Sequence, residues 1–271
     1  MGVDPSACGA SAQRFSGFAD VYDRYRPGPP EILGAILTRL LRAPRPRLVV
    51  DVGSGTGLST RYWAERADRV IGIEPAADMR GRAEESTEAP KISYREAYSH
   101  DTGLAEGCAD IVTCSQSLHW MEPLPTFREA RRILRPGGVF AAYDYDWPPA
   151  TGCWEADAAY EECMERVRAM ERDLPGRIAP LQWDKQGHLT RMRESGCFRY
   201  TREIVMHHEE QGSAERLVGL LLSQGAVQTL LRAGSSERDL GIDLLRRTAT
   251  RVLGTEPQVW LWSSRLRVGV T

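Results

Sequence analysis

The chain has 271 residues, of which 42% are hydrophobic and 27% charged, a composition typical of a globular protein with room for one large domain. A net charge of only −2, without a block of lysines or arginines, argues against a nucleic acid or an anionic membrane as partner. The six scattered cysteines include no C-x-x-C pair, and the longest apolar runs are too short to cross a bilayer. We therefore expect no metal site, no disulfide framework, no signal peptide and a cytoplasmic location.

Helical periodicity and short apolar runs alternate from residue 31 to residue 146. The expected helices are Glu31–Leu41, Leu58–Ala67, Ala77–Ser86 and Leu124–Ile133, the last closed by the stop signal Arg135-Pro136-Gly137-Gly138. The expected strands are Arg47–Val52, Arg69–Glu74, Ile92–Glu96, Ala109–Cys114 and Val139–Tyr145. This alternation predicts an α/β protein with a doubly wound, mostly parallel sheet.

The pattern changes after residue 146. One helical insertion contains Ala156–Arg172, a short helix covers Leu189–Ser195, and residues 213–253 form a second helical insertion. The two remaining strands, Tyr200–His207 and Val259–Val268, are expected to pair at the edge of the sheet. We predict one domain over residues 1–271 with a seven-stranded Rossmann-like sheet and an antiparallel edge strand. Residues 43–146 would form its α/β core, and residues 14–42, 147–185 and 213–254 a helical cap.

The most informative stretch is an apolar strand that runs into the glycine turn Asp51-Val52-Gly53-Ser54-Gly55-Thr56-Gly57, after which the next apolar run ends on Glu74. Glycines let the backbone approach a ligand, and a carboxylate at the tip of the next strand suits a ribose diol because it only accepts hydrogen bonds. The dinucleotide pattern G-x-G-x-x-G needs a small residue where Leu58 stands. A dinucleotide-dependent oxidoreductase and a purely structural turn are the alternatives.

Five motifs resemble those of the class I S-adenosylmethionine-dependent methyltransferases. VVDVGSGTG resembles the first motif of that family, IGIEPAADM the second, REAYS the adenine-contacting region, DIVTCSQSLHWM the fourth-motif strand with its loop, and ILRPGGVF the turn into the fifth strand. The opening FSGFADVYDRYRP and the SLHW stretch resemble a bacterial subgroup that acts on small molecules. The resemblance implies an enzyme that uses S-adenosylmethionine and releases S-adenosylhomocysteine.

The same resemblance implies which residues hold the cofactor. The glycines of the turn would approach its methionine part, Asp51 would lie near its amino group, and Glu74 would accept hydrogen bonds from its ribose hydroxyls. Glu96 stands where the family often has Asp, so the adenine is expected to rely more on the backbone of Ala97 and Tyr98. The full expected set is Tyr22, Arg26, Asp51, Gly53, Gly55, Gly57, Glu74, Glu96, Ala97, Tyr98, Ser115 and Gln116.

A sulfonium is already an activated methyl donor, so such a protein mainly aligns the acceptor with the methyl group and excludes water. The candidate catalytic residues are Tyr22, which would close over the site, and His119, which would remove a proton from an oxygen or nitrogen acceptor. Packing within its loop is the alternative for His119. Arg26 would pair with the carboxylate of the cofactor, and a place at the surface is its alternative.

Aromatic residues gather in the predicted cap and next to it, where rings can stack on a flat or hydrophobic acceptor. Core packing is the alternative for each of them. Asp144 and Asp146 follow the fifth strand, and either acid could hold a polar group of the acceptor, cap a helix or form a salt bridge. The expected acceptor-binding residues are Tyr25, Trp120, Tyr145, Trp147 and Trp183.

These observations predict in-line transfer of a methyl group to a small, aromatic or partly apolar acceptor of natural-product (secondary) metabolism. One form would be C-methylation of an electron-rich ring such as an indole. The alternatives are O-methylation of a small carboxylic acid or phenol, and a non-catalytic regulator that binds the cofactor. The expected partner is the small-molecule acceptor, with the protein acting as a monomer or a homodimer.

Overall fold

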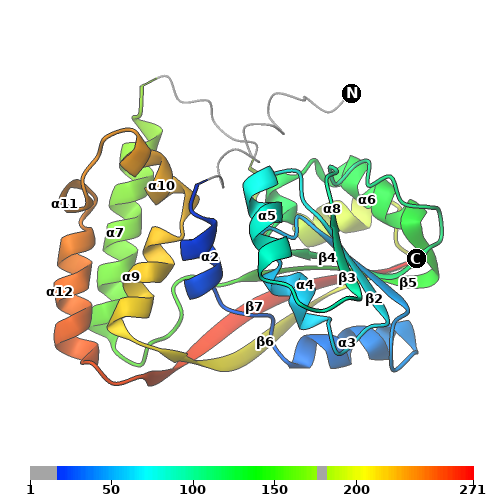
Figure 1. Ribbon diagram of the computed structural model, residues 1–271, viewed down its shortest axis with the longest axis horizontal. Coiled ribbons are helices and arrows are strands. Elements are labelled where there is room, and N and C mark those ends of the chain that lie inside the picture. The colour runs from blue at the N-terminus through cyan, green and yellow to red at the C-terminus, as the bar shows by residue number, and fades with distance from the viewer. Residues whose placement is uncertain (1–16, 176–181) are drawn as a thin grey trace.

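In the computed structural model, which describes residues 17–175 and 182–271, the chain forms a seven-stranded sheet that extends on one side into a group of helices (Figure 1). The strand order is β3-β2-β1-β4-β5-β7-β6. The strands are β1 Leu48–Val52, β2 Arg69–Ile73, β3 Ile92–Arg95, β4 Ala109–Ser115, β5 Leu134–Tyr145, β6 Tyr200–Gly212 and β7 Gln258–Val270.

Strands β1 to β5 are parallel, whereas β7 pairs antiparallel with both β5 and β6. The predicted Rossmann-like sheet with antiparallel pairing at one edge is thus confirmed. The chain reverses its direction of travel across the sheet between β1 and β4. In open α/β sheets, ligands bind beside such a reversal, at the carboxyl ends of the strands.

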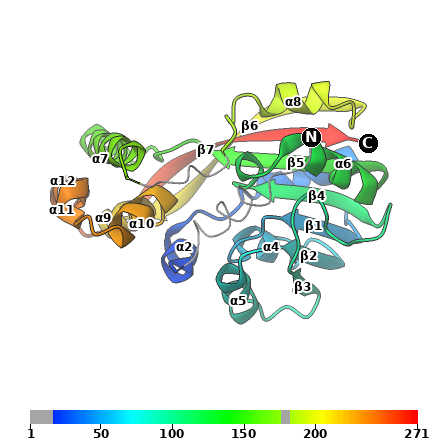
Figure 2. The ribbon, with the colours of Figure 1, turned by 90° about the horizontal axis from the view of Figure 1, so that it is seen from above.

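The helices divide between the two faces of the sheet and a separate lobe. They are α2 Ala19–Tyr25, α3 Ile32–Leu41, α4 Leu58–Tyr62, α5 Ala77–Glu85, η1 Leu118–Trp120, α6 Pro123–Ile133, α7 Trp154–Arg172, α8 His188–Glu194, α9 Ala214–Leu222, α10 Gly225–Arg232, α11 Glu237–Leu240 and α12 Ile242–Leu253. Figure 2 shows α4 and α8 on opposite faces of the sheet. Successive strand residues point to opposite faces, so Val49 packs in a cluster with Leu33 of α3, and Val50 in a cluster with Phe127 of α6 and Met192 of α8.

Strand β5 begins five residues earlier than predicted. The segment Arg135-Pro136-Gly137-Gly138, expected as a turn, lies inside the strand. Ala109 of β4 pairs with Leu134, but Ile111 pairs with Val139, so the extra residues of β5 form a bulge. Gly137 takes a left-handed φ of +78° there, a conformation that glycine adopts without steric cost.

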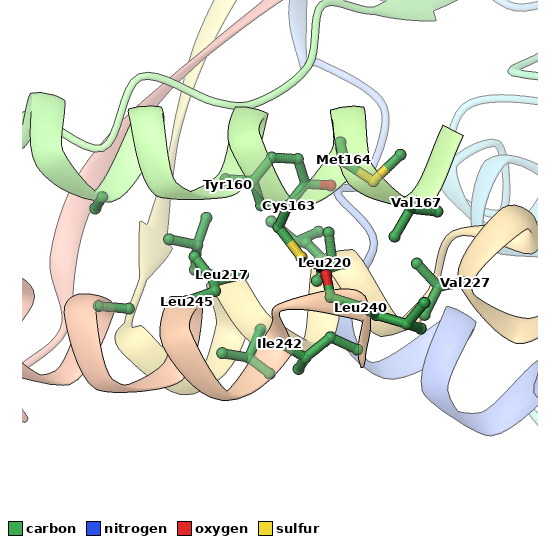
Figure 3. Packing of buried hydrophobic residues seen from close by; sticks show 14 of the residues in the cluster. Tyr160, Cys163, Met164, Val167, Leu217, Leu220, Val227, Leu240, Ile242 and Leu245 are labelled. Carbon is green, nitrogen blue, oxygen red and sulfur yellow. Dashed lines mark hydrogen bonds between the residues drawn. The ribbon is translucent and has the colours of Figure 1, made fainter. Parts of the chain in front are cut away.

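Strands β6 and β7 are thirteen residues each and pair along their whole length. Strand β6 continues from His207 to Gly212, beyond its predicted end, whereas β7 differs from its prediction by one residue at its start and two at its end. They carry the chain from the sheet to the helical lobe, which consists of α7 and α9–α12 (Figure 1). Leu217 and Leu220 of α9 pack there against Tyr160 and Val167 of α7 (Figure 3). The apolar residues Leu217, Leu220, Leu221 and Leu230 of the second insertion therefore lie in the interior of this lobe.

No helix within the described ranges combines the length and the apolar composition that crossing a bilayer requires.

Candidate functional site

The glycine turn lies between the end of β1 and the start of α4. The amides of Gly53 and Ser54 donate to the carbonyl of Ile73 at the end of β2, at 2.8 and 3.1 Å, and tie the turn to the neighbouring strand. A Cβ on Gly57 would lie 2.3 Å from the hydroxyl of Tyr94. Gly55 has a left-handed φ of +54°, and no atom of the described chain lies within 4 Å of the place its Cβ would take. The turn thus leaves space beside Gly55 that a ligand can enter.

Glu74 directly follows β2 and faces the glycine turn. One carboxylate oxygen accepts from the amide of Gly55 and the other from the amide of Ala76, each at 2.9 Å. Each oxygen keeps a further lone pair for a hydroxyl donor. Burial raises the pKa of Glu74 to about 7, although both amides favour the ionised form. The pair of Gly55 and Glu74 therefore fits the ribose of a nucleoside: open backbone on one side, and a carboxylate with free acceptor sites on the other.

A cleft begins at these two residues and continues past β3 and β4. Ala97, Tyr98, Ser115 and Gln116 line it, as predicted residues of the cofactor set, together with Tyr22 from α2. Several further residues that were not predicted individually also line the cleft: Ile73, Pro75, Met79, Ser99, His100, Ser117 and Met121. The exposed side chain of Glu96 lies outside this lining and pairs with Arg80 at 2.7 Å.

Asp51 lies beneath the turn and not in the wall of the cleft. Its fully buried carboxylate accepts from the hydroxyls of Thr60 and Thr113, each at 2.8 Å, and from Ser59 at 3.3 Å. Burial raises its pKa, and the three hydroxyls oppose that shift. In this structure the Asp51 side chain connects β1, β4 and α4, and so fixes the position of the glycine turn.

A larger cavity of about 1200 Å³ opens between the carboxyl edge of the sheet and the helical lobe. Three residues line both the cleft and this cavity: Tyr22, Gln116 and Trp120. Gln116 has a left-handed φ of +53°, rare for a residue with a side chain, and its buried Nε2 has no hydrogen-bond partner among the described residues. These three residues therefore mark the passage between the two spaces.

His119 lies in the cavity wall with 5% of its surface exposed. Its Nδ1 is 3.5 Å from Oδ1 of Asp144, at the end of β5. Burial lowers the pKa of His119, so the imidazole is neutral at pH 7 and able to accept a proton. The same Asp144 carboxylate pairs with Lys185 at 3.1 Å and with the buried Arg267 at 3.0 Å. Burial by itself would raise the pKa of Asp144, but Lys185 and the contact with His119 hold it well below the usual range.

The predicted acceptor residues divide into two groups. Trp120, Tyr145, Trp147 and Trp183 line the cavity. Tyr25 does not: its ring packs against α9 at Gly219, and its hydroxyl donates to Glu215 at 2.8 Å. These contacts with α9 place the side chain of Tyr25 against the helical lobe.

Sequence reasoning missed the cations around Asp144. Arg267 lies in β7 between Leu266 and Val268, and a charged residue between two apolar ones was the available signal. Lys185 is in the loop before α8, and its Nζ also donates to Oε1 of Gln116 at 3.1 Å. No sequence motif indicates Lys185, because its partners Asp144 and Gln116 are distant in the sequence and meet it only in the folded chain.

Comparison with known proteins agrees with this geometry. A family model described as a methyltransferase domain matches residues 50–142. The malonyl-[acyl-carrier protein] O-methyltransferase of Pectobacterium atrosepticum is 35% identical over 133 residues, which cover 49% of this chain and 51% of that protein. A Dictyostelium discoideum protein assigned as a methyltransferase is 28% identical over 150 residues, 55% of either chain. The matched region thus spans about half the length of these curated relatives.

Solved structures resemble this fold over more of the chain. A protein of Anaeromyxobacter dehalogenans assigned to the type II methyltransferases superimposes with a TM-score of 0.68 at 24% identity, over 91% of this chain and 98% of its own. The phosphoethanolamine N-methyltransferase 2 of Haemonchus contortus, solved with S-adenosylhomocysteine, gives a TM-score of 0.53 at 15% identity, over 98% of this chain and 57% of its own. At these identities the likeness is one of fold. The family match ends before the helical lobe, whose residues form much of the larger cavity.

Proposed function

This chain belongs to the class I S-adenosylmethionine-dependent methyltransferases, and we propose that it transfers a methyl group from S-adenosylmethionine to a small acceptor held in the larger cavity. The observation that carries the proposal is the juxtaposition of the open backbone at Gly55 with the buried carboxylate of Glu74, at the point where the strand order reverses. A passage lined by three shared residues joins that cleft to a cavity large enough for an organic molecule.

In this proposal the cofactor lies along the cleft. Glu74 accepts hydrogen bonds from the ribose hydroxyls, Gly53 and Gly55 face the methionine part, and Ala97 and Tyr98 flank the adenine. Ser115 and Gln116 lie near the methionine amino group, and Asp51 acts through the turn that it supports. When bound, the cofactor supplies an activated methyl group on a sulfonium.

The residues at the passage would position the acceptor for the reaction. Tyr22, Gln116 and Trp120 align the acceptor with the methyl group and keep water out. The attacking atom of the acceptor forms a bond to the methyl carbon while the bond from carbon to sulfur breaks. Where that atom carries a proton, neutral His119 accepts it, and Asp144 stabilises the imidazolium that results.

The aromatic part of the cavity supports a small, aromatic or partly apolar acceptor, since the indoles of Trp120, Trp147 and Trp183 offer flat apolar faces. We propose natural-product metabolism as its source and C-methylation of an electron-rich ring such as an indole as one reaction. O-methylation is the second candidate, and the relative named as a malonyl-[acyl-carrier protein] O-methyltransferase supports it.

We further propose that residues 43–146 bind the cofactor, and that residues 14–42, 147–185 and 213–254 cap the acceptor. Residues 14–16 and 176–181 of this cap lie outside the described ranges.

Calorimetric titration with S-adenosylmethionine and S-adenosylhomocysteine tests the proposal first, with NAD and a Glu74→Ala variant as controls. We expect micromolar binding of both sulfur compounds that the variant loses, and no binding of NAD. An acceptor screen with a labelled methyl donor would follow. Binding of NAD alone would replace this proposal with an oxidoreductase, and cofactor binding without transfer to any acceptor would favour a regulator.

A further inference from the structure

Arg26, just after α2, is a cation in the wall of the larger cavity whose described contacts are all with uncharged groups. Its Nε donates to Oγ of Ser223 at 2.8 Å, and its Nη2 donates to the carbonyl of Ser223 at 2.9 Å and to Oε1 of Gln224 at 3.1 Å. The guanidinium also lies 4.7 Å from the ring centre of Tyr22 and 4.6 Å from that of Trp147. Three hydrogen bonds and two rings therefore fix its orientation.

The neighbouring cations of the cavity are neutralised. Lys185 and Arg267 share the carboxylate of Asp144, and Arg265 pairs with Asp146 at 3.2 Å. Within the part of the chain that the structure describes, no carboxylate lies within ion-pair distance of Arg26. Arg168 of α7 also lines the cavity without a described ion pair, but no described hydrogen bond orients its guanidinium.

The contacts of Arg26 leave one nitrogen of the guanidinium, Nη1, without a partner among the described residues. A guanidinium has five N–H donors, and the three bonds above use Nε and both hydrogens of Nη2. The two hydrogens of Nη1 have no acceptor among the described residues. A partly buried positive charge without a counter-ion is unfavourable for the empty protein, and a guanidinium already held in place can donate from Nη1 to an oxyanion with little further loss of entropy.

We propose that Arg26 binds a carboxylate group of the acceptor, so that the substrates are organic acids with an aromatic or apolar body. This inference rests on the proposed function and concerns the group that anchors the acceptor, whichever atom is methylated. The carboxylate of the cofactor is the other source of the same chemistry. Arg26 lines the larger cavity rather than the cleft, with Tyr22 between it and the passage, and this placement favours the acceptor.

Titration with matched acids and amides tests this assignment. Benzoate and benzamide, and indole-3-acetate and indole-3-acetamide, would be titrated by calorimetry into the protein with and without S-adenosylhomocysteine. We expect at least one acid to bind ten times more tightly than its amide, and Arg26→Gln to reduce that ratio to about one while its affinity for S-adenosylhomocysteine stays within twofold of wild type. Arg26→Lys, which keeps the charge but loses the fork, should retain part of the preference.

Arg24→Gln is the matched control, because Arg24 lies on the same helix, is 68% exposed and pairs with Glu215. It should bind every ligand as the wild type does. A loss of S-adenosylhomocysteine affinity in Arg26→Gln, with the acid preference intact, would assign Arg26 to the cofactor and overturn the inference. Equal affinities of acid and amide for the wild type would overturn it as well. Failure of S-adenosylhomocysteine to bind the wild type would count against the proposed function alone, since the acids are also titrated without it.

Discussion

Glu74 is a carboxylate whose protonation near neutral pH is set by its burial. The amides of Gly55 and Ala76 offset only part of the cost of placing its charge in the protein, so its pKa is about 7. A ribose diol donates hydrogen bonds and therefore favours the ionised form. If Glu74 binds the ribose as proposed, the affinity for the cofactor is coupled to the proton on this side chain.

We predict that S-adenosylhomocysteine binds more weakly as the pH falls through 7, by up to about tenfold for each further unit. Above pH 7 the carboxylate is ionised and accepts from both hydroxyls, whereas below it one oxygen carries a proton and repels those donors. Calorimetric titrations at pH 6, 7 and 8 measure the effect. Glu74→Gln should bind weakly without pH dependence, and Glu84→Gln, an exposed acid on α5, should behave as wild type. A flat profile for the wild type would contradict the assignment of Glu74.

His119 is expected to act on the acceptor and not on the cofactor. His119→Asn should lower the rate constant of methyl transfer by about 10² to 10⁴ for an acceptor that must lose a proton. Its affinity for S-adenosylhomocysteine should stay unchanged, because His119 lies in the larger cavity. Single-turnover rates with the first acceptor found measure this, with His207→Asn on the exposed part of β6 as control. Undiminished transfer would show that the acceptor reacts without a base.

Two glycines of the turn are expected to be needed for different reasons, Gly55 for ligand binding and Gly57 for folding. Gly55 and Gly57 both have positive φ, which costs a residue with a side chain about 1–2 kcal/mol. Only at Gly57 does an added Cβ meet the chain, because Tyr94 is confined there between Gly57 and Gly72. At Gly55 the added carbon would enter the cleft instead.

We therefore predict opposite outcomes for two alanine variants. Gly55→Ala should fold with a modest loss of stability and lose at least tenfold in affinity for S-adenosylhomocysteine. Gly57→Ala should lose more stability than Gly55→Ala, because the ring of Tyr94 has to move. Thermal denaturation and calorimetry on the two variants measure both effects. A Gly55→Ala variant with full affinity would mean that no ligand approaches this backbone.

Local patterns predicted the parts of the site that lie close together in the sequence. The glycine turn and Glu74 were recognisable because strand, turn and strand tip follow one another within 27 residues of the chain. Asp144 with Lys185 and Arg267 was not, because its partners come from β7 and from the loop before α8. Tyr25 was predicted to bind the acceptor but packs against α9, because aromatic composition alone does not tell which residues of a short helix meet the cavity.

Element identity was also easier to predict than element ends. The alternation of apolar runs and helical periodicity yielded all seven strands. Strand β5 continues through a proline and two glycines because these residues form a bulge against β4. The sequence of one strand alone does not predict such pairing. The outer part of β6, from His208 to Gly212, pairs with β7 beyond the sheet, so the length of β6 depends on a partner strand and not on local propensity.

The helical lobe has an apolar interior of its own, apart from the two clusters that flank the sheet. Leu220 lies at its centre with no exposed surface (Figure 3). Leu220→Ala should cost about 2–5 kcal/mol and raise amide hydrogen exchange in α7, α9 and α12 more than in the sheet. Urea unfolding and exchange mass spectrometry measure these effects, with Leu244→Ala, 46% exposed on α12, as the matched control. Equal acceleration of exchange in β1 and β4 would show that the lobe and the sheet open as one unit.

Because Tyr22, Gln116 and Trp120 form walls of both spaces, we expect the binding of the two proposed ligands to be coupled thermodynamically. Whichever ligand binds first restricts these side chains, and the second then orders fewer groups. S-adenosylhomocysteine should raise the affinity for the acceptor, and by reciprocity the acceptor should raise the affinity for S-adenosylhomocysteine by the same factor. A coupling factor of one in a closed cycle of titrations would mean that the shared walls are rigid. A factor above one would mean that the protein binds S-adenosylhomocysteine most tightly when an acceptor is present.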